Sequence, residues 1–418
     1  MSTDAPTPAD APAARRTPLV PLLTLLLLGN VSVIAVFTGA STLIPARLAE
    51  IDPANKEALW GTIQGISAVF ATLFNPIGGA LSDRTRSRMG RRHPWLLGSA
   101  LIGFGVLAFL GSATTVVMIG IAWCLAQAVM NIFMAALTAI IPDRVLPARR
   151  GTASAVMGVG TSLGAIVGTQ VAARYVDEGA LAYLIFGGTV LVAALLFATC
   201  TRDPRPGEYE ESQNVTLAES FVTFLAALKH RDFMWVWLGR ALMVLGYFMV
   251  LMFMLFILSD YITLPEGLKP TDAMATAVTV STVAGMAATI IGGPLSDWTG
   301  RRKLFVVASG VVTACALLIP LLVPTWSAFL IYAGLHGAAF GWYSAVDIAL
   351  MTLILPRSED AGRDMGVLNI ANAGPQIIAP FIAASVIGAF GGYPALFITG
   401  MVISLVGAVA VLPVKSVR

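Results

Sequence analysis

Two charged residues interrupt long apolar stretches of this sequence and are its strongest candidates for chemistry. Arg240 lies within the apolar run 233–260, and Asp347 lies within the run 325–355. Of the 26 basic and 23 acidic residues, these two fall well inside such runs. A carboxylate kept away from water can bind and release a proton, and a nearby arginine favours its ionised form. The opposite charges predict an ion pair whose proton affinity responds to substrate or conformation.

The composition of the chain indicates what surrounds these two charges. Hydrophobic residues make up 57% of the 418 residues, charged residues make up 12%, and the mean hydropathy is +0.82. A soluble domain is about 45–50% apolar and about 25% charged. Such an excess cannot be hidden inside a soluble fold, so the composition excludes a soluble enzyme, a disordered regulator and a fibrous protein. It predicts a polytopic membrane protein.

Twelve apolar runs are long enough to form helices across a bilayer, which requires about 20 residues each. They are 18–44, 58–81, 93–112, 114–141, 152–173, 181–200, 233–260, 272–295, 303–323, 325–355, 365–388 and 392–413. The two-residue alternation of a membrane β-barrel is missing. We therefore predict an all-α membrane protein with twelve transmembrane helices.

Polar segments divide these runs into two sets of six. The sequence predicts a disordered tail at 1–17 and a six-helix bundle at 18–200. A polar linker at 201–232 is followed by a second six-helix bundle at 233–413 and a short tail at 414–418. An amphipathic stretch at 221–228 is expected to lie on the membrane surface.

The distribution of basic residues predicts the orientation of the chain. With both ends on one side of the membrane, 21 Lys and Arg residues lie on that side and four lie in the opposite loops. The positive-inside rule therefore predicts that both termini are cytoplasmic. The excess of Arg over Lys, with abundant Ala and Gly, favours a GC-rich bacterium and hence its cytoplasmic (inner) membrane.

The two predicted bundles share a sequence motif. The stretch GGALSDRTRSRMGRR at 78–92 matches GGPLSDWTGRR at 292–302, which places Asp83 and Asp297 214 positions apart. The shared order of Gly, Leu, Ser and Asp argues for duplication of a six-helix unit. Duplicated halves around a central site are the architecture of many secondary transporters.

Both copies resemble a loop signature of the major facilitator superfamily. The residues that carry the resemblance, and that we predict to form a cytoplasmic gate, are Gly79, Asp83, Arg84, Gly90, Arg91 and Arg92 in the first copy and Asp297, Arg301 and Arg302 in the second. Gly293 and Gly300 of the second copy also carry the resemblance. The resemblance implies two pseudo-symmetric bundles around a central cavity, alternating access and a small-molecule substrate.

The two aspartates of the motif suggest how such a gate would work. Each is expected to accept hydrogen bonds from the start of a neighbouring helix and from arginine. Such a cluster would lock the halves together while the cavity faces outward. A basic face that serves only membrane topology is the alternative interpretation of the arginines.

A longer match resembles the glycoside–pentoside–hexuronide cation symporters and the related sucrose/proton transporters. It runs from Asn75 to Trp95, and the spacing of Asp347 with Asn369 and Asn372 is similar to the same group. Sodium-coupled melibiose-type members carry carboxylates at the positions of Ala71 and Asn75. Neither residue is acidic here, which argues against a sodium site of that kind and against the substrate inherited with it. The proton is the predicted coupling ion because of the buried Asp347.

In the superfamily fold, spans 1, 4, 7 and 10 line the central cavity, so the resemblance places Arg240 and Asp347 beside the transport path. Helical spacing puts Tyr247 on the face of Arg240, and it puts His336 and Tyr343 on the face of Asp347. Amide and aromatic side chains suit a polyhydroxylated ligand. The predicted substrate cavity comprises Asn30, Gln127, Asn131, Tyr247, Tyr343, Asn369, Asn372 and Gln376. Each amide could instead hold helices together.

Three functions remain open from sequence. They are a proton-coupled importer of a sugar or glycoside, a proton-coupled exporter of drugs or metabolites, and a membrane receptor or sensor that transports nothing. Gly160, Gly164 and Gly168 are expected to pack against the other half, and their span lacks the Gly-Pro typical of exporters.

Other partners and activities find no support in the sequence. It contains no phosphate-binding loop and no nucleophile elbow, and its three cysteines are far apart. The formal charge of +3 does not suggest a nucleic-acid partner. We expect no enzyme activity, metal or cofactor, and a monomer in the lipid bilayer.

Overall fold

The computed structural model describes residues 18–203, 231–354 and 361–414, with side chains described outside 233 and 348–372. Across these ranges the protein is helical and contains no β-strand, although Thr263 and Thr325 form one isolated bridge. The predicted all-α class is therefore confirmed. The predicted tail at 1–17 and the predicted surface helix at 221–228 lie outside the described residues.

The first half of the chain contributes six long helices. They are α1 (Leu19–Ile51), α2 (Lys56–Arg84), α3 (His93–Ser112), α4 (Val116–Arg144), α5 (Arg150–Arg174) and α6 (Gly179–Cys200). Single 3-10 turns, η2 (Pro147–Arg149) and η3 (Val176–Glu178), precede α5 and α6. Helix α1 continues through Pro45 to Ile51, beyond the predicted end at 44, and Pro45 is buried within it.

The second half repeats this series with one interruption. Its helices are α8 (Arg231–Met252), α9 (Met254–Asp260), α10 (Pro270–Thr299), α11 (Arg302–Leu322), α12 (Trp326–Ile354), α13 (Ala361–Ala389) and α14 (Tyr393–Ala410). The predicted single helix over 233–260 is wrong at one point, because the chain leaves helical geometry at Phe253 and divides into α8 and α9. The two pieces together form one span.

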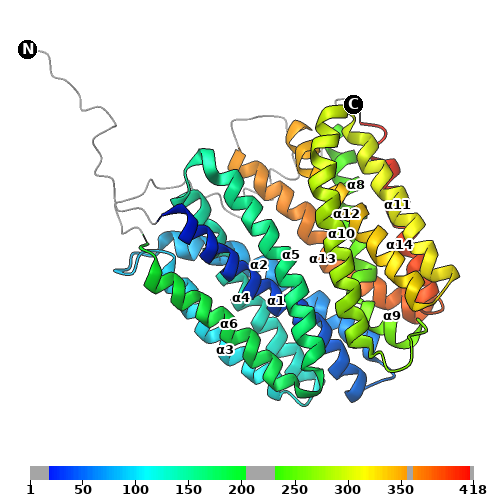
Figure 1. The fold of residues 1–418 in the computed structure, drawn as a ribbon, viewed down its shortest axis with the longest axis horizontal. Coiled ribbons are helices and arrows are strands. Elements are labelled where there is room, and N and C mark those ends of the chain that lie inside the picture. Colours follow the sequence, from blue (N-terminus) through cyan, green and yellow to red (C-terminus); the bar gives the residue numbers. More distant parts are fainter. Residues whose placement is uncertain (1–17, 204–230, 355–360, 415–418) are drawn as a thin grey trace, which may run out of the picture.

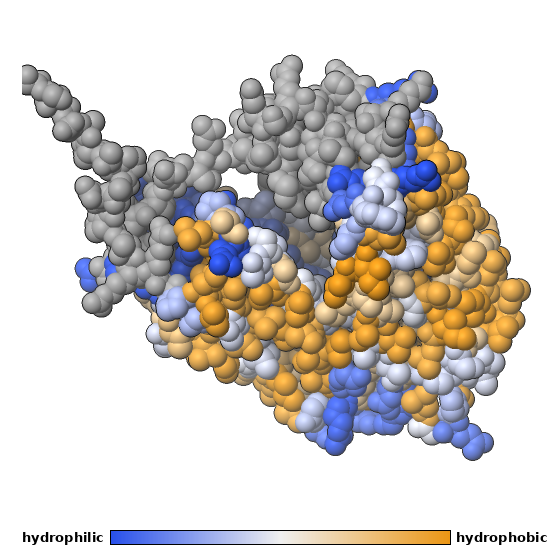
Figure 2. All heavy atoms as spheres, turned by 45° about the horizontal axis from the view of Figure 1, so that its top comes forward, coloured by the Kyte–Doolittle hydropathy of each residue, from blue (hydrophilic) through white to orange (hydrophobic). Residues whose placement is uncertain are grey.

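Ten helices of the described residues are long and apolar enough to cross a membrane. Helices α12 and α13 add two more of 29 residues each. Together these helices account for the twelve predicted spans. Figure 2 shows hydrophobic residues over much of the outer surface and hydrophilic residues gathered toward its ends, as expected of a protein surrounded by lipid.

The helices of each half pack in the same pattern. In the first half, α1 packs against α5 and α6, α2 against α4, and α3 against α4 and α6. In the second half, α8 packs against α13 and α14, α10 against α12, and α11 against α12 and α14. A shift of six spans converts one pattern into the other, as a duplicated unit requires.

The two ends of the molecule can be named by the segments they carry (Figure 1). The terminal face carries the start of α1, the end of α14 and the α2–α3 and α10–α11 connections, whereas the far face carries the α1–α2 and α9–α10 connections. The halves contact each other through α2 with α13 and α5 with α10.

Contacts between the halves close the far face. Trp60 on α2 donates from Nε1 to the carbonyl oxygen of Met252 at 2.8 Å, and Gln170 on α5 donates to Thr279 on α10 at 3.3 Å. Both pairs lie in the far-face half of their helices. At the terminal face, by contrast, the surface is hollowed between the two halves (Figure 2).

The glycine stripe of α5 packs within its own half, so the expectation that it contacts the other half is wrong. A Cβ at Gly164 would lie 2.7 Å from the Cβ of Ile34, and one at Gly168 would lie 2.5 Å from the carbonyl oxygen of Ala35. Both neighbours belong to α1. Glycine lets the two helix backbones approach this closely, which fixes α1 beside α5.

Candidate functional site

The two predicted intramembrane charges form an ion pair. Arg240 Nη1 on α8 contacts Asp347 Oδ2 on α12, and Tyr343 donates from its hydroxyl to Asp347 Oδ1 at 2.8 Å. Arg240 is 7% exposed and Asp347 is 5% exposed. The pairing of these two residues is therefore confirmed. Both side chains are nearly enclosed by protein.

The guanidinium of Arg240 retains unused hydrogen-bonding capacity. Its Nε atom is buried and has no acceptor among the described residues. A buried donor without an acceptor costs free energy, commonly about 1–3 kcal/mol. Arg240 can therefore accept a further partner, such as a substrate hydroxyl, without first giving up a hydrogen bond from Nε.

An aromatic stack connects the same two helices. The ring of Tyr247 on α8 stacks on His336 at 4.6 Å and on Phe340 at 3.8 Å between ring centroids, and both of these residues lie on α12. His336 is 2% exposed. The ring of Tyr247 is thus already engaged in joining α8 to α12.

The predicted amides of the first half differ in their surroundings. Asn30 on α1 donates to the carbonyl oxygen of Met157 at 2.7 Å and to Thr161 at 3.0 Å. It therefore bridges α1 to α5, the packing role that membrane amides often have. Asn131 donates to the side-chain oxygen of Gln127 at 3.3 Å on the same helix.

A further polar contact near these amides was missed by the sequence analysis. Trp123 on α4 donates from Nε1 to the side-chain oxygen of Gln64 on α2 at 3.1 Å. Trp123 is fully buried, and a buried indole N–H needs an acceptor.

The remaining predicted cavity residues lie on α13. The side chains of Asn369 and Asn372 are outside the described residues. Gln376 is partly buried. The structure therefore brings together Arg240, Asp347 and Tyr343, and separately Gln127 and Asn131.

The first copy of the loop motif forms a charged cluster inside the first half. Asp83 contacts Arg92 at 2.5 Å and Arg91 at 4.0 Å. Both arginines also contact Asp143 at the end of α4, with Arg92 Nε at 2.8 Å from it. The cluster joins α2, the α2–α3 loop and α4. The sequence analysis missed Asp143. This residue directly precedes Arg144, and the loop that contains them was used only in the count of basic residues.

Burial would lower the pKa of Arg92, but the carboxylates of Asp143 and Asp83 outweigh burial and raise it above its ordinary value. The guanidinium therefore stays charged at any physiological pH. Arg91 is 6% exposed and Arg92 is 2% exposed. Both carry fixed positive charges within the protein at this end of the bundle.

A different aspartate accepts hydrogen bonds from the start of α3. Asp203 accepts from the backbone N–H of Arg92 at 2.5 Å and of His93 at 3.2 Å. The expectation that Asp83 performs this role is therefore wrong. Asp203 belongs to the segment that follows α6, and it packs against Gly90, whose φ of +89° and missing side chain make room for it.

Other residues of the first motif lie at the periphery. Arg84 is exposed, and a Cβ added at Gly79 would meet no atom within 4 Å. These two positions take no part in the charged cluster among the contacts described above.

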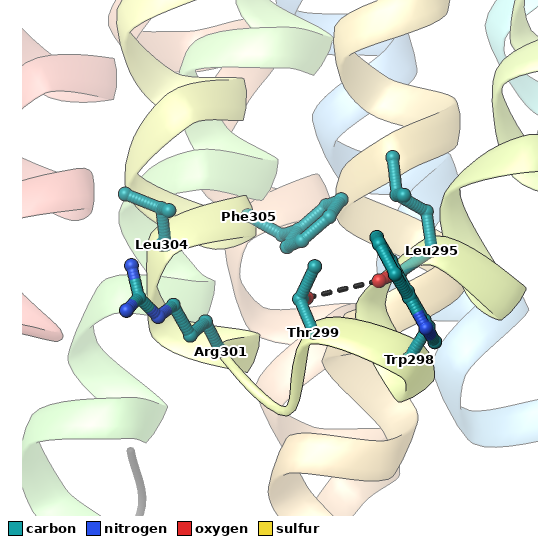
Figure 3. A pocket seen from close by; sticks show the side chains of 6 residues that line it. All are labelled: Leu295, Trp298, Thr299, Arg301, Leu304 and Phe305. Atoms are coloured by element: carbon teal, nitrogen blue, oxygen red, sulfur yellow. Dashed lines mark hydrogen bonds between the residues drawn. The ribbon is translucent and has the colours of Figure 1, made fainter.

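The second copy of the motif is more open to solvent. Asp297 contacts Arg302 at 3.0 Å, and the side chain of Asp297 is 68% exposed. Arg301 borders a cavity of about 380 Å³ where α10 ends and α11 begins, at the terminal face. Trp298 and Phe305 also line this cavity (Figure 3). This cavity is separate from the Arg240–Asp347 pair. The two motif copies thus share a sequence pattern but differ in burial.

The helix order, the six-span repeat of the packing and the ion pair between two spans define a membrane transporter fold. The family model described as Major Facilitator Superfamily matches residues 26–269 and 258–417, so this chain belongs to the Major Facilitator Superfamily. The resemblance of the loop motifs is thereby confirmed.

Solved structures agree with this assignment of the fold. The nucleoside transporter NupG superposes with a TM-score of 0.75 at 14% identity over 94% of this chain and 99% of that one. A bacterial homologue of the human lysosomal transporter Spinster, in an inward-facing and unoccupied conformation, gives a TM-score of 0.66 at 16% identity over 94% and 95%.

Curated relatives match over short segments. An uncharacterised symporter of Synechocystis is 52% identical over 44 residues, which are 10% of this chain and 8% of the relative. A general alpha-glucoside permease of Schizosaccharomyces pombe is 32% identical over 116 residues, which are 23% of this chain and 21% of the relative. The match covers less than a quarter of either relative.

Proposed function

We propose that this protein imports a sugar or glycoside together with protons, by alternating access across the cytoplasmic membrane of a bacterium. The observation that carries the proposal is the enclosed cluster of Arg240, Asp347 and Tyr343 between α8 and α12. A buried ion pair is costly to maintain, and replacing it with apolar residues is often neutral or stabilising. Such a pair in a membrane span favours a role in function.

The cluster suggests how a proton and a substrate could be linked. Protonation of Asp347 removes the charge that holds Arg240. The guanidinium is then free to donate to the hydroxyl oxygens of a ligand, starting with Nε, which lacks an acceptor in the described structure. Substrate and proton thereby favour each other, which is the requirement for symport.

The choice of a sugar rests on polar side chains and on relatives. The contact between Gln127 and Asn131, with the Arg240 cluster, offers donors and acceptors suited to hydroxyl groups. The similarity to an alpha-glucoside permease supports this choice, and the similarity to a symporter supports coupled import. We keep Tyr247, Tyr343, Asn369, Asn372 and Gln376 as proposed cavity residues, whereas Asn30 is better explained as helix packing.

The charge distribution supports an orientation for this conformation. If the arginine-rich terminal face is cytoplasmic, the closed far face and the hollowed terminal face describe an inward-facing state. In this state the Asp83–Arg91–Arg92–Asp143 cluster holds one half together. We propose that the cytoplasmic gate closes when this cluster meets Asp297, Arg301 and Arg302 of the second half.

The test is uptake by proteoliposomes that contain the purified protein. A panel of labelled sugars and glycosides is supplied with an imposed pH gradient that is acidic outside. Asp347→Asn is expected to abolish gradient-driven accumulation while keeping substrate exchange at equal pH. Glu178→Gln, an exposed carboxylate on the far face, serves as the matched control and should accumulate substrate normally. Normal accumulation by Asp347→Asn would refute the proton site.

A binding screen distinguishes the import of sugars from drug export. Sugars and commonly exported drugs are compared for their ability to raise the melting temperature of the protein. Stabilisation by a sugar, lost in Arg240→Gln, supports the proposal. Stabilisation by lipophilic drugs alone would replace it with the exporter.

A further inference from the structure

The cavity at the terminal face combines an apolar lining with one basic side chain. It measures about 380 Å³ and lies where α10 ends and α11 begins. In Figure 3, Leu295 and Trp298 of α10 lie on one side, Arg301 and Leu304 of α11 lie on the other, and Phe305 lies between them. We name this cavity the terminal groove, lined by these five residues and Thr299.

Helix α12 closes the inner side of the terminal groove. Both α10 and α11 pack against α12, and the ring of Phe305 meets that of Trp342 on α12 edge to face, with 6.3 Å between their centroids. On the opposite side the groove is open, because Trp298 is 84% exposed and Leu304 is 55% exposed. A molecule can therefore enter it from the surroundings without displacing a helix.

Exposed apolar side chains continue from the groove toward the middle of the membrane. Ile291 lies one helical turn before Leu295 on α10 and is 60% exposed, and Val311 lies two turns after Leu304 on α11 and is 44% exposed. Spacings of four and seven residues keep each pair on one helical face. Helix α11 packs against α12 and α14 of its own half, so its remaining surface faces lipid. The terminal groove is thus the interfacial end of an acyl-chain surface.

Trp298 marks the level of the lipid headgroups. Tryptophan is concentrated at the boundary between hydrocarbon and water, where its ring contacts acyl chains and its N–H contacts polar groups. The first copy of the loop motif has Arg84 at the corresponding position. The motif itself therefore does not require a tryptophan here, and its exposed ring fits a lipid better than it fits water.

Three aspartates neutralise the buried arginines of the first motif. Asp83 and Asp143 each form ion pairs with the same two residues, Arg91 and Arg92. Asp203 adds a third carboxylate at the backbone of Arg92. The chain thus supplies the anions that this basic end of the first half needs.

The second half retains one of these three acids. At the offset of 214 residues between the motifs, one acid is kept as Asp297, and the other two are replaced by Arg357 and Val417. Asp297 contacts Arg302, whereas Arg301 forms no ion pair with the described residues. The charge of Arg301 is therefore available to an anion from outside the chain.

We propose that the terminal groove binds an anionic phospholipid of the surrounding leaflet. The headgroup phosphate lies at Arg301, whose planar guanidinium matches phosphate oxygens, and an acyl chain lies along Leu295 and Leu304. Basic pockets between transmembrane helices are suited to acidic lipid headgroups. A free phosphate would satisfy the arginine but would leave the apolar lining and Trp298 uncovered, so the groove fits a lipid and not an inorganic anion.

The bound lipid gives the second half the anion that aspartates give the first. This inference goes beyond the proposed function, because neither the transported solute nor the proton enters it. It is tested without substrate, so a protein that transports no sugar would leave the result unchanged.

The test uses two sets of vesicles that contain equal amounts of phosphatidylglycerol and phosphatidylcholine with identical acyl chains. In one set the phosphatidylglycerol chains carry bromine, which quenches the fluorescence of nearby tryptophan, and in the other set the phosphatidylcholine chains carry it. The purified protein is reconstituted in both sets. Subtraction of the signal of Trp298→Phe, which keeps an aromatic ring in the groove, isolates the quenching of Trp298.

In the parent, brominated phosphatidylglycerol should quench Trp298 more strongly than brominated phosphatidylcholine. In Arg301→Gln, this preference should fall by about fivefold, the contribution of one basic residue near an anionic membrane surface. Arg84→Gln is the matched control, because Arg84 is an exposed arginine of the other motif copy and lies outside the groove. It should keep the preference of the parent.

Four results would overturn the lipid site. They are equal quenching by the two lipids in the parent, a preference that survives in Arg301→Gln, and a loss of preference in both arginine variants, which would indicate general attraction to a basic face. The fourth concerns free anions. If excess inorganic phosphate removes the preference at an ionic strength matched with sodium chloride, the groove binds phosphate and not a phospholipid.

Discussion

The carboxylate of Asp347 has a different partner on each oxygen, with Tyr343 donating to Oδ1 at 2.8 Å and Arg240 contacting Oδ2. Tyr343 lies one helical turn before Asp347 on α12, so this contact is local. The contact with Arg240 joins α12 to α8. The same carboxylate therefore takes part in the local structure of one helix and in the packing of two.

Removal of the Asp347 charge should destabilise the protein. Asp347→Asn leaves the guanidinium of Arg240 buried without its counter-ion, and breaking a buried pair in this way costs about 3–5 kcal/mol. The double variant Arg240→Gln/Asp347→Asn should recover much of that loss. Thermal unfolding of both variants in the same detergent measures the difference. Equal melting temperatures for the single and double variants would contradict the coupling of the two charges.

Removal of the Tyr343 hydroxyl should have a smaller effect. Tyr343→Phe deletes one hydrogen bond to a charged acceptor, which is commonly worth about 1.5–3 kcal/mol, while the ion pair remains. We expect a lower melting temperature than in the parent, but a higher one than in Asp347→Asn. If Tyr343→Phe is as damaging as Asp347→Asn, the phenol and not the arginine is the principal partner of Asp347.

The two loop motifs should respond differently to loss of an acid. Asp143→Asn removes a charge that contacts both buried arginines and should lower the melting temperature clearly. Asp297→Asn affects an exposed pair, and such pairs contribute about 0–1 kcal/mol, so its effect on stability should be small. Thermal unfolding of the two variants, measured side by side, tests this asymmetry. A larger loss in Asp297→Asn would reverse our assignment of the buried cluster.

The glycines of α5 offer a test of close helix packing. In Gly168→Ala, the new methyl group would collide with Thr38 and Ala35 of α1, so we expect poor folding or a large loss of stability. Gly158→Ala on the same helix is the matched control, because a Cβ there meets no atom within 4 Å. It should be neutral or stabilising by up to about 1 kcal/mol. Yields of folded protein and melting temperatures provide the measurement.

The cap of α3 can be tested through Asp203. Asp203→Ala removes the acceptor for two backbone N–H groups at the start of the helix. Loss of a helix cap costs about 0.5–2 kcal/mol. Asp203→Asn keeps an oxygen acceptor and should retain part of this stability. If both variants unfold like the parent, the contact between the segment after α6 and the start of α3 contributes nothing measurable.

Much of the fold could be predicted because the signals for it are local. A run of about 20 apolar residues specifies a membrane span by its own length. Ten of the twelve predicted runs coincide with described helices that are long and apolar enough to cross a membrane. The other two runs coincide with α12 and α13. The break at Phe253 was missed because its surroundings are as apolar as the rest of the span.

Parts of the site could be predicted for a similar reason. A lone charge in an apolar run is conspicuous, and two of opposite sign suggest a pair, as Arg240 and Asp347 show. Asp143 and Asp203 were missed because acidic residues at the ends of spans are common and carry no local signal. Their roles arise from helices that meet in space.

The sequence by itself determined the class of protein, the number of spans and the identity of the two intramembrane charges, because hydropathy and charge act on each segment separately. The tertiary structure alone decided that Asn30 bridges α1 to α5, that the α5 glycines face α1, and that Glu57, Asp260 and Tyr393 meet at the far face. These relationships depend on which helix faces lie together. That choice is made by the packing of the whole bundle, because every apolar face in a membrane can be satisfied equally by lipid or by another helix.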